Sequence, residues 1–138
     1  MEPNTEALFI ADHMTDYLRV WKDALVDGVR SDRPDLTNRQ MAVLMIVYLD
    51  PGPHTVRGLA ARIKVAKPVI TRALNSLEAH GYVRRKKDMS DRRNLFVQRT
   101  VAGAVFLSEI GDSIAQRAGY YDRASTAAAN TAPAVSAA

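Results

Sequence analysis

The fold of this chain is decided by residues 55–100, TVRGLAARIKVAKPVITRALNSLEAHGYVRRKKDMSDRRNLFVQRT. Apolar residues recur at helical spacing in 56–63 and again in 67–80, with only KVA between the two patterns. Thr55 is a good N-cap for the first helix, and Gly81 is the residue type expected just past the end of the second. Two short helices joined by so short a turn indicate a helix-turn-helix.

The second helix of this pair is predicted to have one apolar and one polar face. Pro68 fits its first turn, where a backbone N–H is not needed. The expected buried stripe is Val69, Ala73, Leu74 and Leu77. The opposite face can enter the major groove of a duplex, and it carries Lys67, Thr71, Arg72 and Asn75. The alternative for Arg72 is an ion pair on the helix surface, for example with Glu78.

The segments 82–86 and 95–100 read as antiparallel strands around the tip KKDMSDRRN, residues 86–94. Asp, Ser and Asn are turn formers, but a turn does not require two adjacent arginines. We therefore expect an external anion to neutralise the hairpin, and a wing arginine gains from the negative potential of a minor groove. Asp91 can accept hydrogen bonds from one arginine or from the backbone of the tip. The candidate wing residues are Arg84, Lys86, Lys87, Asp91, Arg92 and Arg93.

Positive charge is concentrated in this part of the chain. Between Val56 and Thr100 twelve lysines and arginines stand against three acids, a net charge of +9. The rest of the chain carries seven against twelve, a net charge of −5. Such a distribution is typical of a surface that binds a polyanion, although a merely solvated basic face is the alternative.

Helical patterns flank this region on both sides. From Thr5 to about Asp27 apolar residues follow strict steps of four and three, which is the seam of a helix that packs along another helix. The seam residues are Ala7, Ala11, Met14, Leu18, Trp21 and Leu25, and Gly28 is expected to end the helix. Thr37 and Gln40 have capping-box spacing before the apolar run MAVLMIVYL, which predicts a central helix that stops at 50–53.

Thr100 is the expected cap of the last helix. Its apolar stripe is Phe106, Leu107, Ile110 and Ile114. After Arg123 the chain has no charge and reads as an alanine-rich tail. The predicted organisation is an N-terminal dimerisation helix (1–30), a winged helix-turn-helix (31–100), a C-terminal dimerisation helix (101–118) and a flexible tail (119–138). The fold class is mainly α with a small β-hairpin wing.

The segments LTNRQMAVLMIVY and 55–94 resemble the multiple-antibiotic-resistance regulator (MarR) family, over roughly residues 36–110. The most specific parts are KPVITRALNSLEAHGYV and the DRR of the wing tip. The resemblance implies a winged-helix homodimer that binds double-stranded DNA at a palindrome, with Arg72 at the major groove and Arg92 or Arg93 in the minor groove. The expected function is transcription regulation by occlusion or recruitment at a promoter, with repression as the leading interpretation, and with release of the DNA if a small-molecule effector shifts the spacing of the two recognition helices.

The chain departs from the family pattern at three places. Ala66 stands where a serine commonly caps the recognition helix, at a cost of about 0.5 to 2 kcal/mol. A second C-terminal dimer helix is replaced by GYYDR and the alanine-rich tail, so the dimer is expected to depend on 5–27 and 101–117. The peroxide-sensing cysteine of one family branch is missing, since the chain has no cysteine.

Other functions have weaker support in the sequence. Tyr17, Trp21 and Tyr48 are candidates for an effector pocket, with core or dimer interface as the alternative. No cofactor is expected, and neither metal-ligand nor nucleophile–base spacing indicates a metal site or an enzyme. No apolar run is long enough to cross a membrane and the N-terminus is acidic, so the expected location is the cytoplasm. A winged helix that binds another protein is the alternative to DNA binding.

Overall fold

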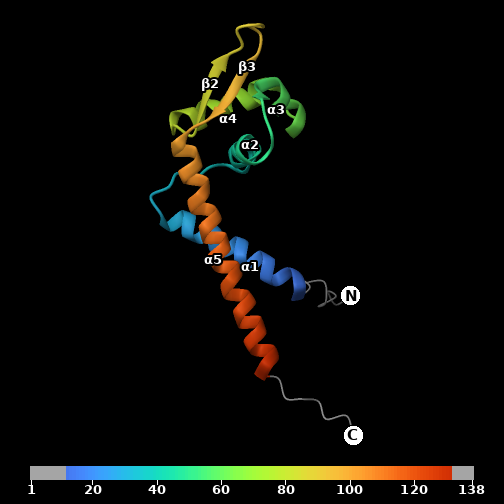
Figure 1. Cartoon of the computed structure of the whole chain (residues 1–138), viewed down its shortest axis with the longest axis vertical. Helices are drawn as coiled ribbons and strands as arrows, with labels where there is room; N and C mark the ends of the chain where they lie inside the picture. Colours follow the sequence, from blue (N-terminus) through green and yellow to red (C-terminus); the bar gives the residue numbers. More distant parts are fainter. Residues whose placement is uncertain (1–11, 132–138) are drawn as a thin grey trace, which may run out of the picture. The chain divides into compact units, whose positions relative to one another are not determined.

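The computed structural model describes residues 12–131. The elements are α1 (Asp12–Arg30), α2 (Asn38–Leu49), β1 (His54–Thr55), α3 (Val56–Ile63), α4 (Lys67–Ala79), β2 (Val83–Lys87), β3 (Leu95–Arg99) and α5 (Val101–Thr131) (Figure 1). They form two units, residues 33–109 and residues 12–32 with 110–131. Each unit is described by itself.

Helices α2, α3 and α4 supply most of the core of the 33–109 unit, and the sheet and α5 supply the rest. Helix α2 is apolar on most sides and begins at the predicted capping box, in which the Thr37 side chain accepts from the Gln40 N–H at 3.1 Å and Gln40 accepts from the Thr37 N–H at 2.9 Å. Thr55 caps α3 as predicted, by accepting from the Gly58 N–H. The largest fully buried side chains are Leu44, Leu59, Ile70, Leu74, Leu77, Val43, Val47 and Val83.

The buried stripe of α4 differs from the prediction at one position. Ile70 is fully buried, whereas Val69 is only half-buried. The two are adjacent in sequence, and the packing of α2 and α3 against α4 decides which of them faces the core. Gly81 adopts a left-handed φ of 78° after α4, as expected for a residue past a helix end.

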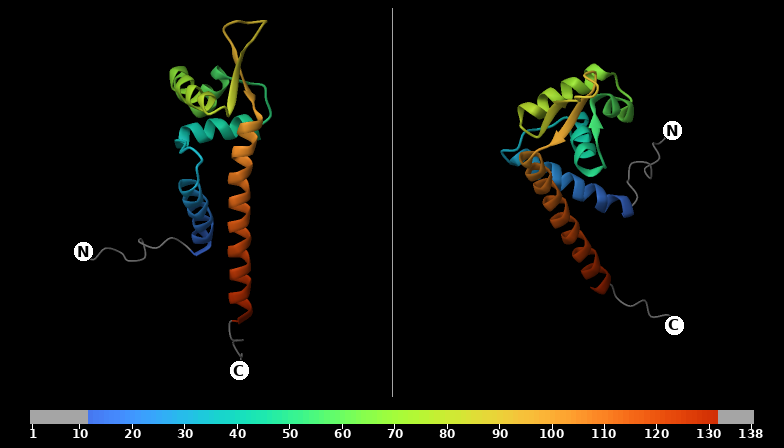
Figure 2. Two further views of the ribbon diagram at one scale, coloured as in Figure 1. Left: turned by 90° about the vertical axis from the view of Figure 1, so that its left-hand side faces the viewer. Right: turned by 45° about the horizontal axis from the view of Figure 1, so that its top comes forward.

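The predicted hairpin is present, and it is part of a three-stranded antiparallel sheet with the order β1-β3-β2. Val83 pairs with Arg99 at its base and Lys87 with Leu95 near its tip. Strand β1 was not predicted, because two residues are too few to show a periodic pattern. The hairpin projects beyond α3 and α4 (Figure 1; Figure 2, left).

The second unit pairs α1 with the C-terminal part of α5. Arg117 donates to Asp27 at 3.0 Å, Ser113 donates to the same carboxylate at 2.7 Å, and Tyr121 donates to Asp23 at 2.6 Å. These bonds tie one face of α1 to α5. The seam residues Met14, Leu18, Trp21 and Leu25 remain 41% to 48% exposed.

The expected stop at Gly28 and the expected end of the last helix near 118 were wrong, whereas the bound of 30 given for the N-terminal helix agrees with the end of α1. Helix α1 continues through Gly28 to Arg30, where the Ser31 hydroxyl bonds the Gly28 carbonyl oxygen at 2.7 Å. Helix α5 continues to Thr131 instead of ending near 118, because the helix propensity of the alanines outweighs the Ser, Thr and Asn among them. The predicted tail therefore overlaps this helix. Residues 132–138 and the seam positions Ala7 and Ala11 lie outside the described part.

Candidate nucleic-acid interface

Helix α4 presents its polar face to solvent because its apolar face is buried against α2 and α3. Lys67, Pro68, Arg72 and Asn75 are exposed, and Thr71 is half-buried. Pro68 lies in the first turn, as predicted. The Thr71 hydroxyl donates to the Lys67 carbonyl oxygen at 3.2 Å, so part of its bonding capacity is used within the helix. An open hollow on this face is lined by Lys67, Pro68, Thr71 and Arg72.

The start of α4 has no side-chain cap. Ala66 has the extended backbone of an N-cap residue, with φ −67° and ψ 147°, but no oxygen with which to accept from the first turn. The first turn also lacks an acidic residue. The positive end of the helix dipole is therefore not offset by a side chain of the helix itself.

The carboxylates of the wing tip are used to shape it. Asp88 accepts from the Ser90 N–H at 2.9 Å and from its hydroxyl at 2.6 Å, and the hydrogen bonds from Ser90 lower the pKa of Asp88. Asp91 accepts from the Arg93 N–H at 3.0 Å. Of the two roles predicted for Asp91, the structure has the bond to the tip backbone. These Asx-type turns hold the tip while the side chains of Arg92 and Arg93 are exposed.

The two faces of β2 have different roles. Arg85 shares the inner face with the buried Val83, and its Nε donates to the Glu78 carboxylate of α4. Arg84 and Lys86 alternate with them and are exposed. Glu78, the alternative partner for Arg72, thus binds the hairpin to α4 instead.

Three of the basic side chains of this segment are held by bonds within the unit. Arg85 binds Glu78, Arg62 lies 2.7 Å from an Asp50 carboxylate oxygen, and Arg99 donates to the Val47 carbonyl oxygen at 2.8 Å. Within residues 12–131, no carboxylate lies within ion-pair distance of Arg72, Arg84, Arg92 or Arg93. The arginines chosen as candidate DNA contacts are therefore not neutralised internally.

The start of α4 and the base of the wing tip share a small hollow. Its lining residues are Val56, Arg57, Lys67, Arg93, Asn94 and Leu95. The fold thus brings Arg57 of α3, Lys67 of α4 and Arg93 of the wing to one place. None of the six lining residues is acidic, so the hollow is positively charged.

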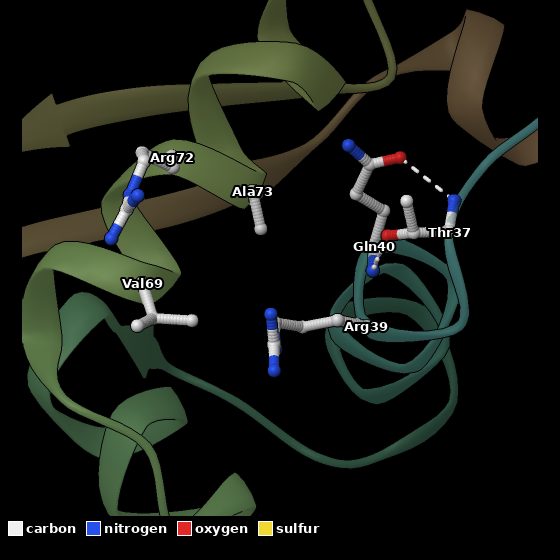
Figure 3. A pocket seen from close by; sticks show the side chains of 6 residues that line it. All are labelled: Thr37, Arg39, Gln40, Val69, Arg72 and Ala73. Atoms are coloured by element: carbon white, nitrogen blue, oxygen red, sulfur yellow. Dashed lines mark hydrogen bonds between the residues drawn. The ribbon is translucent and has the colours of Figure 1, made fainter.

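A third hollow, of about 250 Å³, lies between α4 and the start of α2 (Figure 3). Thr37, Arg39 and Gln40 line it together with Val69, Arg72 and Ala73 of α4. The Arg39 side chain extends from the start of α2 toward α4 (Figure 3). Arg39 was not among the predicted DNA contacts, because it lies outside the basic segment and only tertiary packing brings it to the same hollow as Arg72.

The three effector-pocket candidates are not brought together in one unit. Tyr48 is half-buried in the 33–109 unit, and its hydroxyl bonds the backbone of Tyr82 and Thr100. Tyr17 and Trp21 are on α1, exposed by 73% and 41%. Their role in binding an effector stays a prediction. No cluster of three or more His, Cys, Asp or Glu suited to a metal occurs among residues 12–131.

The MarR family model matches residues 36–95, from the start of α2 to the end of the wing tip. The 33–109 unit thus matches the MarR family over most of its length. This match confirms the family and the fold class expected from the recognition-helix and wing motifs. Within the described helices, none is long and apolar enough to cross a bilayer.

Known proteins resemble this chain in sequence or in fold. The transcriptional regulator HosA of Escherichia coli O157:H7 is 36% identical over 84 residues, a stretch that covers 59% of this chain and 62% of HosA, which is less than two thirds of that relative. The transcriptional regulator Tm0710 from Thermotoga maritima has a similar crystal structure, with 26% identity, a TM-score of 0.57, and 80% of this chain and 72% of Tm0710 covered. Reduced AbfR bound to DNA has a similar fold, with 21% identity, a TM-score of 0.56, and 72% and 68% covered.

Proposed function

We propose that this MarR-family protein is a sequence-specific transcription regulator that binds double-stranded DNA as a homodimer. The proposal rests on the difference between arginines that have partners within the unit and arginines that do not. Arg62, Arg85 and Arg99 are bonded within the winged-helix unit, whereas Arg72 on α4 and Arg92 and Arg93 on the wing tip are exposed and without a carboxylate partner in the described part. A duplex supplies the missing negative charge.

The two exposed elements fit two features of a duplex. Helix α4 enters the major groove, where Lys67, Thr71, Arg72 and Asn75 meet base edges and phosphates. The wing places Arg92 or Arg93 in the neighbouring minor groove, while Arg84, Lys86 and Lys87 meet phosphates beside it. HosA and Tm0710, both named transcriptional regulators, and the DNA-bound AbfR support this proposal.

The homodimer is supported by the exposed apolar seam of α1. A monomer would leave Met14, Leu18, Trp21 and Leu25 partly in water, and a second copy of the helix can cover them. A twofold-symmetric dimer reads a palindrome. Repression follows from occlusion of a promoter. A small molecule releases the DNA only if its affinity for the DNA-bound arrangement of the dimer differs from its affinity for the released arrangement.

Selection of binding sites from random duplexes tests the proposal. We expect a palindrome whose half-sites lie about 10 base pairs apart, and an affinity that falls steeply with salt. Sedimentation of the free protein should give the mass of a dimer. Failure to enrich any duplex, together with capture of a protein ligand by the same basic face, would instead indicate a winged-helix protein-interaction module.

A further inference from the structure

We infer that Arg39, at the start of α2, binds a DNA backbone phosphate next to the major groove that α4 enters. The inference rests on the proposed DNA binding and adds a residue to it. It starts from the hollow between α2 and α4, into which Arg39 extends beside Val69 and Ala73, with Arg72 also in the lining (Figure 3).

The position of Arg39 in its own helix is electrostatically unfavourable. It occupies the first turn of α2, which contains no acidic residue. Cations are disfavoured at the positive end of a helix dipole. Within residues 12–131, no carboxylate lies within ion-pair distance of its guanidinium. Arg39 therefore adds to the positive potential around Arg72 instead of offsetting it, and an external anion would relieve both.

Arg39 and Arg72 are the charged hydrogen-bond donors among the residues that line the hollow. Thr37 and Gln40 bond each other's backbone in the capping box, so their side chains are already engaged. Val69 and Ala73 are small and apolar, and they let a sugar-phosphate backbone come close to α4 without a competing hydrogen bond. Arginine matches the geometry of phosphate oxygens well.

The location favours a phosphate over a base. A helix in the major groove has a sugar-phosphate strand on either side, and residues of neighbouring helices meet these strands. Arg39 belongs to α2, beside the reading face of α4 and not on it. The interaction should therefore contribute to affinity for any duplex without distinguishing one sequence from another.

The test compares Arg39→Ala with wild type on a selected operator and on an unrelated duplex of equal length, by fluorescence anisotropy from about 50 to 200 mM salt. We expect the variant to bind both duplexes more weakly, by the same factor. The slope of log affinity against log salt should fall by about 1 for each phosphate that the variant no longer binds. Arg39→Lys, which keeps the charge, should restore most of the slope.

Arg62→Ala is the matched control. It removes the same charge from the same unit, but the Arg62 guanidinium is already paired with Asp50 at 2.7 Å. It should keep the affinity and the salt slope of wild type. Circular dichroism of each variant verifies that the helices are retained, which is expected because both side chains are exposed.

The outcomes separate this inference from the proposed function. A wild-type protein that binds DNA while Arg39→Ala keeps the full salt slope overturns the inference alone. Weaker binding confined to the operator overturns the assignment to a phosphate, since it indicates an interaction with a base. A wild-type protein that binds no duplex overturns the proposed function, and the role of Arg39 with it.

Discussion

The hydroxyl oxygen of Tyr48 accepts a hydrogen bond of 2.7 Å from the backbone N–H of Thr100. Its own proton is within reach of the carbonyl oxygens of Tyr82, at 2.8 Å, and Thr100, at 2.9 Å. Thr100 in turn caps α5 by accepting from the Gly103 N–H at 3.0 Å. One side chain of α2 thus joins the segment before β2 to the start of α5, so it holds both ends of the hairpin base.

Replacement of Tyr48 by Phe is expected to lower the free energy of unfolding by about 1 to 3 kcal/mol, because it leaves the Thr100 N–H and the Tyr82 carbonyl without this partner in a part-buried site. Urea unfolding followed by circular dichroism measures the change. Tyr120→Phe removes the hydroxyl of a side chain that is 58% exposed, and should stay within about 0.5 kcal/mol of wild type. Equal effects of the two changes would contradict the role of Tyr48.

Two glycines of α5 should respond to alanine with opposite signs. At Gly103 a methyl group would overlap the Tyr48 hydroxyl and the Tyr82 carbonyl oxygen, so Gly103→Ala should destabilise by about 1 to 3 kcal/mol. At Gly111, beyond the neighbouring residues and the backbone of its own helix, residues 12–131 place no atom within 4 Å of the added carbon, so Gly111→Ala should stabilise by about 0.5 to 1 kcal/mol. Thermal unfolding measures both. Helix propensity alone predicts stabilisation at both sites, and that result would argue against the close approach at Gly103.

A cap can be added to α4 at Ala66. Its backbone already has the N-cap conformation, so Ala66→Ser should raise the free energy of unfolding by about 0.5 to 2 kcal/mol. Ala79→Ser places the same change at the exposed last residue of the helix, where a decrease of up to about 0.5 kcal/mol is expected. Chemical denaturation of both variants distinguishes a capping effect from a general effect of serine.

The α1–α5 pairing should weaken in acid. The hydrogen bond from Arg117, and then that from Ser113, lower the pKa of Asp27 from the usual 3.8. Because the pKa of Asp27 is lower in the folded protein than in the unfolded chain, its stabilisation is fully present above the unfolded-state pKa. The stabilisation disappears as the pH falls through the lower pKa of the folded state. Thermal unfolding of Asp27→Asn from neutral pH to about pH 3 should show a smaller acid destabilisation than wild type, and Ser113→Ala an intermediate one. Parallel curves for all three proteins would contradict this assignment.

Arg72→Ala and Arg93→Ala test the proposed DNA-binding roles of α4 and of the wing. Each is expected to weaken specific binding by about 1 to 3 kcal/mol, because each removes a guanidinium that has no carboxylate partner in residues 12–131. Titration of the selected operator at constant salt measures the change in affinity, with Arg62→Ala as the charge control. A double variant with the affinity of wild type would count against both roles.

Local elements were predictable because their signals are local. The capping box at Thr37, the cap at Thr55 and the left-handed Gly81 each depend on a few neighbouring residues, and the structure has all three. The expected stop at Gly28 and the expected end of α5 near 118 were wrong, because one glycine, or a run of Ser, Thr and Asn, does not outweigh the helix propensity of the residues around it. The two-residue β1 exists only through its pairing with β3.

The amino-acid sequence by itself determined the order of helix-turn-helix and wing and the excess of positive charge in that segment. These follow from caps, periodicity and composition, which act over short distances along the chain. Only the tertiary structure decided which cations have a carboxylate partner within the described residues. Glu78 and Asp50 neutralise Arg85 and Arg62, and packing of α2 on α4 brings Arg39 to the hollow that Arg72 also lines. The physical reason is that charge pairing depends on distance in space, which the sequence sets only through the complete fold.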